Sequence, residues 1–108
     1  PIWQEGPVSA EIFTQFGEAL LMDGRPGEAI GLLRRALALG ADPKRVQPRL
    51  ARAFRLRHRF VAARACLLAA LDAGVDVVDV WDDIRPVREA LGDAASRLPV
   101  ELPSSLDS

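Results

Sequence analysis

The chain has 108 residues, of which 49% are hydrophobic and 27% are charged, and this composition fits one globular domain with its own core. Fourteen basic and fifteen acidic residues leave a net charge of −1, which argues against a protein that coats nucleic acid. No apolar run approaches the roughly 20 residues of a membrane span, so no membrane association is expected. The single cysteine, Cys66, excludes an internal disulfide and favours the cytoplasm, without excluding the periplasm.

Alanine and leucine dominate the composition, while tyrosine and asparagine are absent, and this mixture favours helix over strand. Turn signals divide the chain at Asp23–Pro26, Gly40–Pro43, Arg57–Arg59 and Gly74–Asp76. Apolar residues at helical spacing lie between these turns, so we predict an all-α fold of five or six helices. Residues 1–6 form an N-terminal extension and residues 99–108, rich in proline and serine, a flexible tail.

The chain repeats itself with a period of 34 residues. The segment Phe16-Gly17-x-Ala19-Leu20 aligns with Leu50-Ala51-x-Ala53-Phe54, and the turn residue Gly24 aligns with His58. A second shift carries His58 to Gly92 and places Trp81 where the first unit has Phe13, which predicts a core-filling role for Trp81. Trp3 lies before the repeat and either covers the first helix pair or contacts other sequence.

At these residues the chain resembles the tetratricopeptide repeat (TPR) family, whose unit is a helix–turn–helix with alternating small and large positions. The resemblance implies a right-handed helix–turn–helix repeat solenoid with two full hairpins and a C-terminal capping helix. The units span about residues 10–43 and 44–76, with a partial unit over 77–98, in a domain covering 7–98. The resemblance is good over residues 8–74 and weak over 77–92, and another helical hairpin repeat remains an alternative.

Pro86 falls where the middle of the third unit's first helix is expected. Proline inside a helix removes one backbone hydrogen bond and clashes with the preceding turn, so the helix must kink or restart there. We predict a short segment through Asp83, followed by a capping helix from about Pro86 to Leu98.

The sequence offers no catalytic constellation, cofactor motif or metal-ligand spacing, and we expect a protein that is not an enzyme. His58, the one histidine, is expected in an exposed turn, and Cys66 is expected to be a buried or half-buried small hydrophobe. Asp82 and Asp83 are adjacent, so on a helix their carboxylates diverge and do not form a cation site.

Seven basic residues and no acidic one lie between Lys44 and Arg59. Arg45, Arg49, Arg52 and Arg55 follow helical spacing and form one stripe. The period places acidic residues beside this stripe on both neighbouring first helices, so two readings are open: the arginines pair across helix contacts, or they bind a ligand. In the TPR family the first helices line a concave groove, which gives this set of candidate partner-binding residues: Glu11, Thr14, Gln15, Glu18, Arg45, Arg49, Arg52, Arg55, Asp79, Asp82, Asp83 and Glu89.

We therefore expect a non-catalytic adaptor or scaffold that binds a protein or peptide segment bearing both signs of charge. Self-association, as a homo-oligomer or part of a longer array, is the alternative, and Leu32 or Leu68 could form a convex patch for it. A third reading is RNA or polyanion binding by Lys44, Arg45, Arg57 and Arg59.

One ligand of the TPR family, the acidic C-terminus of heat-shock chaperones, is held by basic and amide side chains at positions that match Thr14, Glu18, Arg49, Asp79 and Asp83. Only Arg49 suits such a clamp, so we predict that this ligand does not bind. Thirteen of the fourteen basic residues are arginine, a composition typical of a GC-rich bacterial genome.

Overall fold

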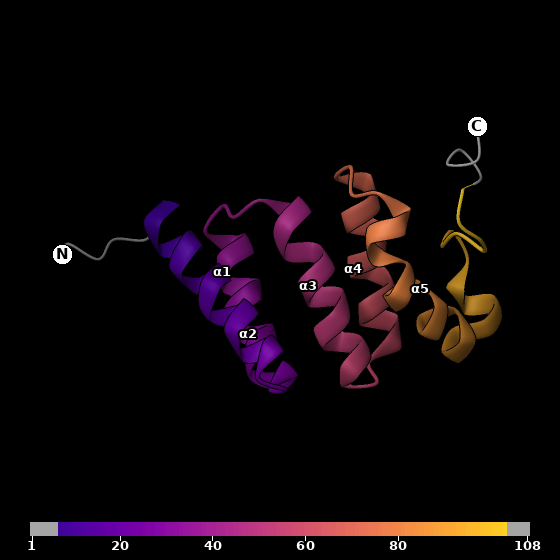
Figure 1. Cartoon of the computed structure of the whole chain (residues 1–108), viewed down its shortest axis with the longest axis horizontal. Coiled ribbons are helices and arrows are strands. Elements are labelled where there is room, and N and C mark those ends of the chain that lie inside the picture. The colour runs from indigo at the N-terminus through magenta and orange to yellow at the C-terminus, as the bar shows by residue number, and fades with distance from the viewer. Residues whose placement is uncertain (1–6, 104–108) are drawn as a thin grey trace.

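Five α-helices and one 3₁₀ turn make up the computed structural model, which describes residues 7–103 (Figure 1). Residues 7–103 contain no strand, so the prediction of an all-α fold is confirmed. Proline occupies the first position of three helices, where its missing N–H has no intrahelical partner to lose. The elements are α1 (Pro7–Met22), α2 (Pro26–Ala38), α3 (Pro43–Leu56), α4 (Phe60–Asp72), α5 (Val77–Leu91) and the 3₁₀ turn η1 (Gly92–Ala95).

The 34-residue spacing of the sequence is also the spacing of the backbone. Helices α2 and α4 each have 13 residues, and their first residues, Pro26 and Phe60, are 34 positions apart. A positive φ recurs at Gly24 (77°), His58 (60°) and Gly92 (56°), the three positions that the period aligns. His58 is exposed in its turn, as predicted.

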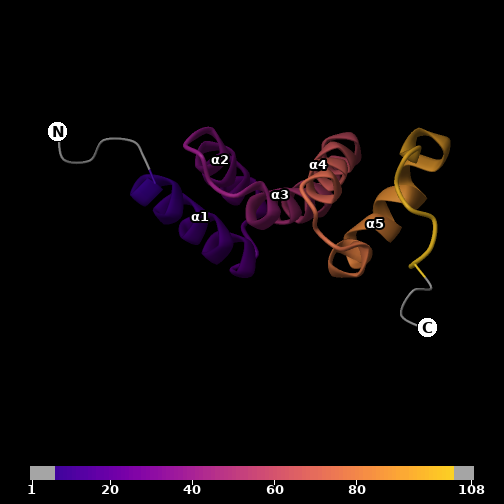
Figure 2. The ribbon, with the colours of Figure 1, turned by 90° about the horizontal axis from the view of Figure 1, so that it is seen from above.

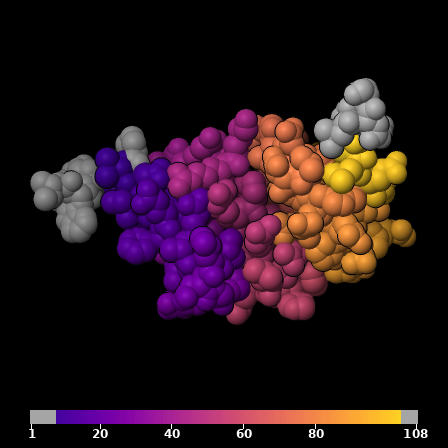
Figure 3. All heavy atoms as spheres, viewed as in Figure 1, coloured from indigo at the N-terminus to yellow at the C-terminus, as the bar shows by residue number. Residues whose placement is uncertain are grey.

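Each helix packs against the next one in the chain, and α3 also contacts both α1 and α5. The helices follow one another along the longest dimension of a body that measures 51 × 31 × 22 Å (Figures 1 and 3). Seen from above, α2 and α4 lie along one side of this row (Figure 2). Within residues 7–103, no helix has the length and apolar character needed to cross a membrane.

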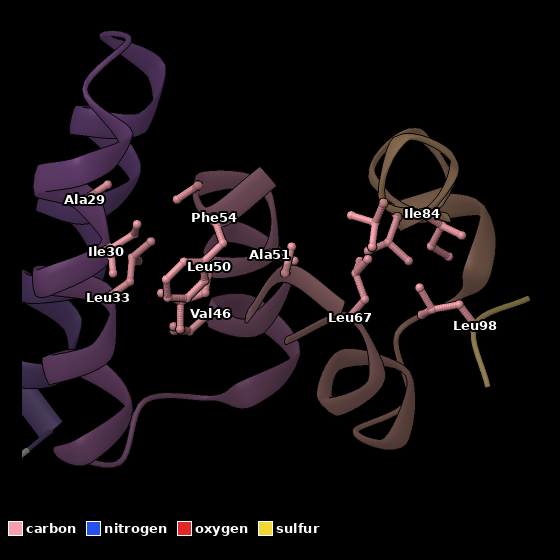
Figure 4. Close-up of a cluster of buried hydrophobic side chains, with 14 of the residues drawn as sticks. Ala29, Ile30, Leu33, Val46, Leu50, Ala51, Phe54, Leu67, Ile84 and Leu98 are labelled. Atoms are coloured by element: carbon pink, nitrogen blue, oxygen red, sulfur yellow. The ribbon is translucent and has the colours of Figure 1, made fainter. Parts of the chain in front are cut away.

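The core runs along the row of helices: α2, α3, α4 and α5 contribute buried side chains to it, and α1 packs partly buried ones, such as Phe13 and Leu20, against it. Leu33, Val46, Leu67 and Ile84 are fully buried and come from α2, α3, α4 and α5 (Figure 4). Trp81 is partly buried against this core, in agreement with its predicted packing role. Trp3 lies outside the described residues.

The prediction for Pro86 was wrong: α5 neither ends at Asp83 nor begins at Pro86, but runs without interruption from Val77 to Leu91. Proline at this position costs about 3 kcal/mol because one helix bond is lost. Burial of Val80, Ile84 and Val87 on both sides of the proline opposes that cost and keeps the segment helical.

The C-terminal cap is therefore not a helix over residues 86–98. It consists of η1 and the irregular segment that follows, whose Ala95 and Leu98 are buried. Two arginines fasten this segment: Arg64 donates to the carbonyl oxygen of Ser96 at 2.6 and 3.0 Å, and Arg88 donates to that of Leu98 at 3.1 Å. Of the predicted tail, residues 104–108 lie outside the described part of the chain.

Candidate functional site

The arginines of α3 are bound on one side by the carboxylates of α1. Arg45 donates to Glu11 at 2.9 and 3.0 Å and to Glu18 at 2.9 and 3.0 Å, and Arg49 forms an ion pair with Glu18. The hydrogen bond from Arg45 holds the pKa of Glu18 below its ordinary value, although partial burial of the carboxyl acts in the opposite direction. The same bonds raise the pKa of Arg45.

On its other side α3 is held by one buried carboxylate of α5. The side chain of Asp83 is 3% exposed and accepts a 2.6 Å hydrogen bond from Nε of Arg55. Arg52 reaches the same carboxylate at 3.4 and 3.5 Å, and 48% of its side chain remains exposed. Asp83 therefore holds Arg55 closely and Arg52 loosely.

These contacts confirm that the basic stripe of α3 is flanked by acidic partners on both sides. Arg45 and Glu11 are 34 residues apart and pair at the position that the period aligns. The other pairs are offset, since Arg55 bonds Asp83 at a separation of 28 residues rather than 34. All four arginines of the stripe thus form ion pairs with carboxylates of neighbouring helices.

A pocket of about 450 Å³ opens where α1, α3 and α5 meet, beside these ion pairs. Charged side chains of both signs form its walls, and Leu21, Met22 and Pro48 supply apolar surface. Asp79, on the wall formed by α5, is exposed and makes no ion pair within residues 7–103. The lining residues are Glu18, Leu21, Met22, Pro48, Arg49, Arg52, Asp79 and Asp83.

A second hollow of about 360 Å³ continues the first toward the start of α3. The two share Pro48, Arg49 and Asp79, and the second adds Lys44 and Asp76. We call the two hollows together the α3 groove. Two adjoining hollows with charges of both signs fit an extended polar segment better than a compact apolar molecule.

Five of the twelve predicted partner-binding residues line the α3 groove: Glu18, Arg49, Arg52, Asp79 and Asp83. Glu11 and Arg45 lie at a separate hollow of about 210 Å³. Gln15 and Arg55 bond to neighbouring carboxylates, and Asp82 and Glu89 are exposed outside the groove.

The prediction that Thr14 contacts a partner is not supported by its position. Thr14 is 1% exposed, and its hydroxyl donates to the carbonyl oxygen of Ala10 at 2.7 Å. The side chain satisfies its hydrogen bond within its own helix and, although it borders the hollow at Glu11 and Arg45, it leaves almost no surface for a partner to contact.

The sequence reasoning missed the apolar part of the groove. Pro48 lies inside α3 and lines both hollows, while Leu21 and Met22 close the last turn of α1. A proline in a helix interior was the available signal, because the carbonyl left without a partner has to be reached by solvent or a ligand. Met22 is 90% exposed, which its place in a predicted helix does not reveal.

The reactive residue types stand apart from the groove. Burial raises the pKa of the Cys66 thiol to about 11, so it is protonated at neutral pH. The ring of His58 packs edge-on against Phe60, with centroids 5.6 Å apart. Over residues 7–103, no three histidine, cysteine or acidic side chains are grouped as metal ligands would be.

The four residues of the polyanion reading do not form one patch. Arg45 is engaged by two carboxylates, and Lys44 lies at the opposite end of α3 from Arg57 and Arg59. The length of this helix separates the two ends by about 20 Å.

No family model, curated protein or solved structure matches this chain. Its function is therefore inferred from the repeat, the charge pairing and the α3 groove.

Proposed function

We propose that this chain is a non-catalytic protein–protein interaction module, an adaptor or scaffold of the TPR type, which binds an extended segment of a partner protein in the α3 groove. The observation that carries the proposal is the groove itself, which is lined by acidic, basic and apolar side chains where three helices meet. A surface of this kind suits a peptide whose side chains differ in charge along its length.

The TPR part of the proposal rests on the repeat. The 34-residue spacing of helices and turns, together with the contacts of α3 with α1 and α5, is what stacked helix–turn–helix units of this family require. In such a stack the first helices α1, α3 and α5 line one face, which is where the groove lies.

The available charges specify the partner segment. Asp79 is an acidic group without an ion pair in the described chain and suits a lysine or arginine of the partner. Arg52 holds Asp83 only at 3.4 Å and can bind a partner carboxylate while Arg55 keeps Asp83 satisfied. Leu21, Met22 and Pro48 provide apolar surface that an apolar side chain of the partner can contact, in the same pocket as these charges. The segment thus carries basic, apolar and acidic side chains in proximity.

The acidic C-terminus of heat-shock chaperones does not fit this groove. Arg49 is paired with Glu18 and also donates to the carbonyl oxygen of Arg45 at 2.6 Å, while Asp79 and Asp83 repel a terminal carboxylate. We expect no binding of such a peptide in a fluorescence titration. Micromolar affinity that Arg49→Glu abolishes would refute this expectation.

Selection of peptides from a displayed random library tests the proposed function. We expect the chain to enrich peptides of mixed charge, and we expect the double variant Asp79→Lys, Arg52→Glu to lose them. Arg85→Glu is the matched control, because Arg85 is exposed on α5 and lines neither hollow of the groove.

Two results would overturn the proposal. One is that the library yields no peptide whose binding depends on Asp79 or Arg52. The other is that the double variant and the Arg85→Glu control bind the selected peptides equally well. Circular dichroism of each variant shows whether the helices remain folded, so lost binding is not confused with unfolding.

A further inference from the structure

The outer face of α1 carries a row of exposed apolar side chains, which we call the α1 stripe. Ile12 is 47% exposed, Phe16 60% and Met22 90%, and Val8 and Ala19 are also exposed. Their spacing places them on one face of the helix, and the row holds no charged side chain. The residues of the α1 stripe are Val8, Ile12, Phe16, Ala19 and Met22, of which Met22, at the end of the row, also borders the α3 groove.

Three of these positions, Ile12, Phe16 and Ala19, are buried in the later units, where another helix precedes, whereas the positions aligned with Val8 and Met22 are exposed. Shifts of 34 and 68 residues carry Ile12, Phe16 and Ala19 onto positions of α3 and α5 whose side chains are at most 2% exposed. On α3 these side chains pack against α2, and on α5 the equivalent ones pack against α4 (Figure 4). The buried equivalents are Val46, Leu50 and Ala53 on α3, and Val80, Ile84 and Val87 on α5.

The α1 stripe therefore has the composition of a helix interface and lacks a helix against it within residues 7–103. The covering helices show which geometry fits. Since α2 and α3 are joined by a short turn, α2 runs antiparallel to α3, and α4 runs antiparallel to α5 in the same way. A helix that covers the α1 stripe in the same way lies antiparallel to α1.

We propose that the α1 stripe pairs with the α1 stripe of a second copy of this chain about a two-fold axis. A two-fold axis perpendicular to α1 places the second α1 antiparallel to the first, which is the required orientation. With the axis at the centre of the stripe, near Gln15, Ile12 of each copy lies opposite Ala19 of the other, so a large side chain meets a small one.

Charge favours a second copy over an unrelated partner. In a two-fold contact each residue near the axis faces its own equivalent, so any charge there is repelled, and the α1 stripe has none. Glu11 and Glu18, which border the stripe, are already paired with Arg45 and Arg49. The net charge of −1 adds little repulsion between copies.

The convex residues considered from the sequence are less suited to self-association. Leu32 and Leu68 are both partly buried, whereas the side chains of the α1 stripe are exposed. The helix at the end of the row, rather than the convex side, thus provides the contact between copies.

Sedimentation equilibrium of the full chain from micromolar to millimolar concentration tests the proposal. We expect a monomer–dimer equilibrium that persists at high salt, because an apolar contact is not screened. Phe16→Glu and Ile12→Glu should each weaken the dimer by more than about tenfold. Near the axis, the charge at position 16 is buried against its own equivalent, and the charge at position 12 is buried against the apolar Ala19 of the other copy. Both sites are exposed, so these variants are expected to fold, and circular dichroism checks this.

Val61→Glu is the matched control, because Val61 is 72% exposed on α4 and lies outside the stripe. It should leave the dimer unchanged. A wild-type chain that stays monomeric at every concentration would overturn the proposal. So would a dimer that Phe16→Glu, Ile12→Glu and Val61→Glu affect equally, or one that dissociates at high salt.

Discussion

The two helical hairpins, α1/α2 and α3/α4, share one backbone plan but differ in the side chains that they place on it. Their turns use the same left-handed position, at Gly24 and at His58. At aligned positions, however, Glu11 of the first hairpin faces Arg45 of the second. Two identical hairpins would place like charges opposite each other. The two hairpins fit together because the facing residues at this aligned position carry opposite charges.

The two sides of α3 extend this comparison. Toward α1, exposed or half-buried carboxylates bind its arginines, whereas toward α5 the single carboxylate is buried. Burial removes water as an alternative partner, so the same kind of ion pair becomes more costly to break. We infer that the α5 side holds the array together and that the α1 side contributes mainly to specificity and charge balance.

The largest expected effect comes from Asp83→Ala. Loss of the buried carboxylate leaves Arg55 and Arg52 without their acceptor. Because both guanidinium groups reach solvent, we expect the free energy of unfolding to fall by about 2–3 kcal/mol. Urea denaturation measures this, and Asp82→Ala, an exposed neighbour on the same helix, should change it by less than about 0.5 kcal/mol. Equal effects of the two variants would contradict the distinction between the sides of α3.

Gly17→Ala tests the difference between the hairpins at the contact of Gly17 in α1 with Leu33 in α2. A Cβ atom at Gly17 would lie 2.6 Å from the side chain of Leu33, which is fully buried, whereas the aligned position in α3 is Ala51. We expect a net destabilisation of about 1–2 kcal/mol in urea denaturation, because the crowding exceeds the gain in helix propensity. Gly31→Ala, on open helix surface, should stabilise the chain by up to about 1 kcal/mol. Stabilisation by both substitutions would show that the first hairpin tolerates the packing of the second.

The pH dependence of stability tests the α1 side of α3. Because the pKa of Glu18 is lowered in the folded chain, its contribution is fully present above the ordinary glutamate pKa of about 4.3 and is lost as pH falls through the lowered pKa. Glu18→Gln should cost about 1 kcal/mol at neutral pH and progressively less as the pH falls through this range. Glu89→Gln, at an exposed site outside these ion pairs, is the control and should change the free energy of unfolding little at neutral or acidic pH. A cost of Glu18→Gln that does not depend on pH would refute the assigned pairing.

The smallest expected effect concerns the turns. His58 adopts the left-handed conformation that glycine occupies at the aligned Gly24, and a side chain in this conformation costs about 1 kcal/mol. His58→Gly should raise the thermal stability by about 0.5 kcal/mol, after loss of the ring contact with Phe60. The reverse change, Gly24→His, should lower it by about 1 kcal/mol, because only the backbone conformation resists it. A loss of stability in His58→Gly, or a gain in Gly24→His, would indicate that the two turns are not equivalent.

The repeat and the acid–base alternation could be predicted from the sequence, because both depend on residue type at fixed spacing. The course of α5 through Pro86 could not, since tertiary burial of Ile84 and Val87 outweighs a local proline signal. The offset of the pair between Arg55 and Asp83 depends on how far one helix is displaced along the next, which spacing along the chain does not encode. Thr14 was misplaced because its hydroxyl is satisfied by a carbonyl of its own helix, which leaves no trace in the charge pattern.

The charge balance along the arginine stripe of α3 underlies the proposed protein-binding function, and affinity for random-sequence RNA at physiological salt tests it most directly. The wild-type chain should not bind, because Glu11, Glu18 and Asp83 occupy the arginines of α3. The double variant Glu11→Gln, Glu18→Gln frees Arg45 and Arg49 and should gain RNA binding that weakens as salt is raised. Tight binding by the wild-type chain that the double variant does not strengthen would contradict the neutralisation of the stripe by its carboxylate partners.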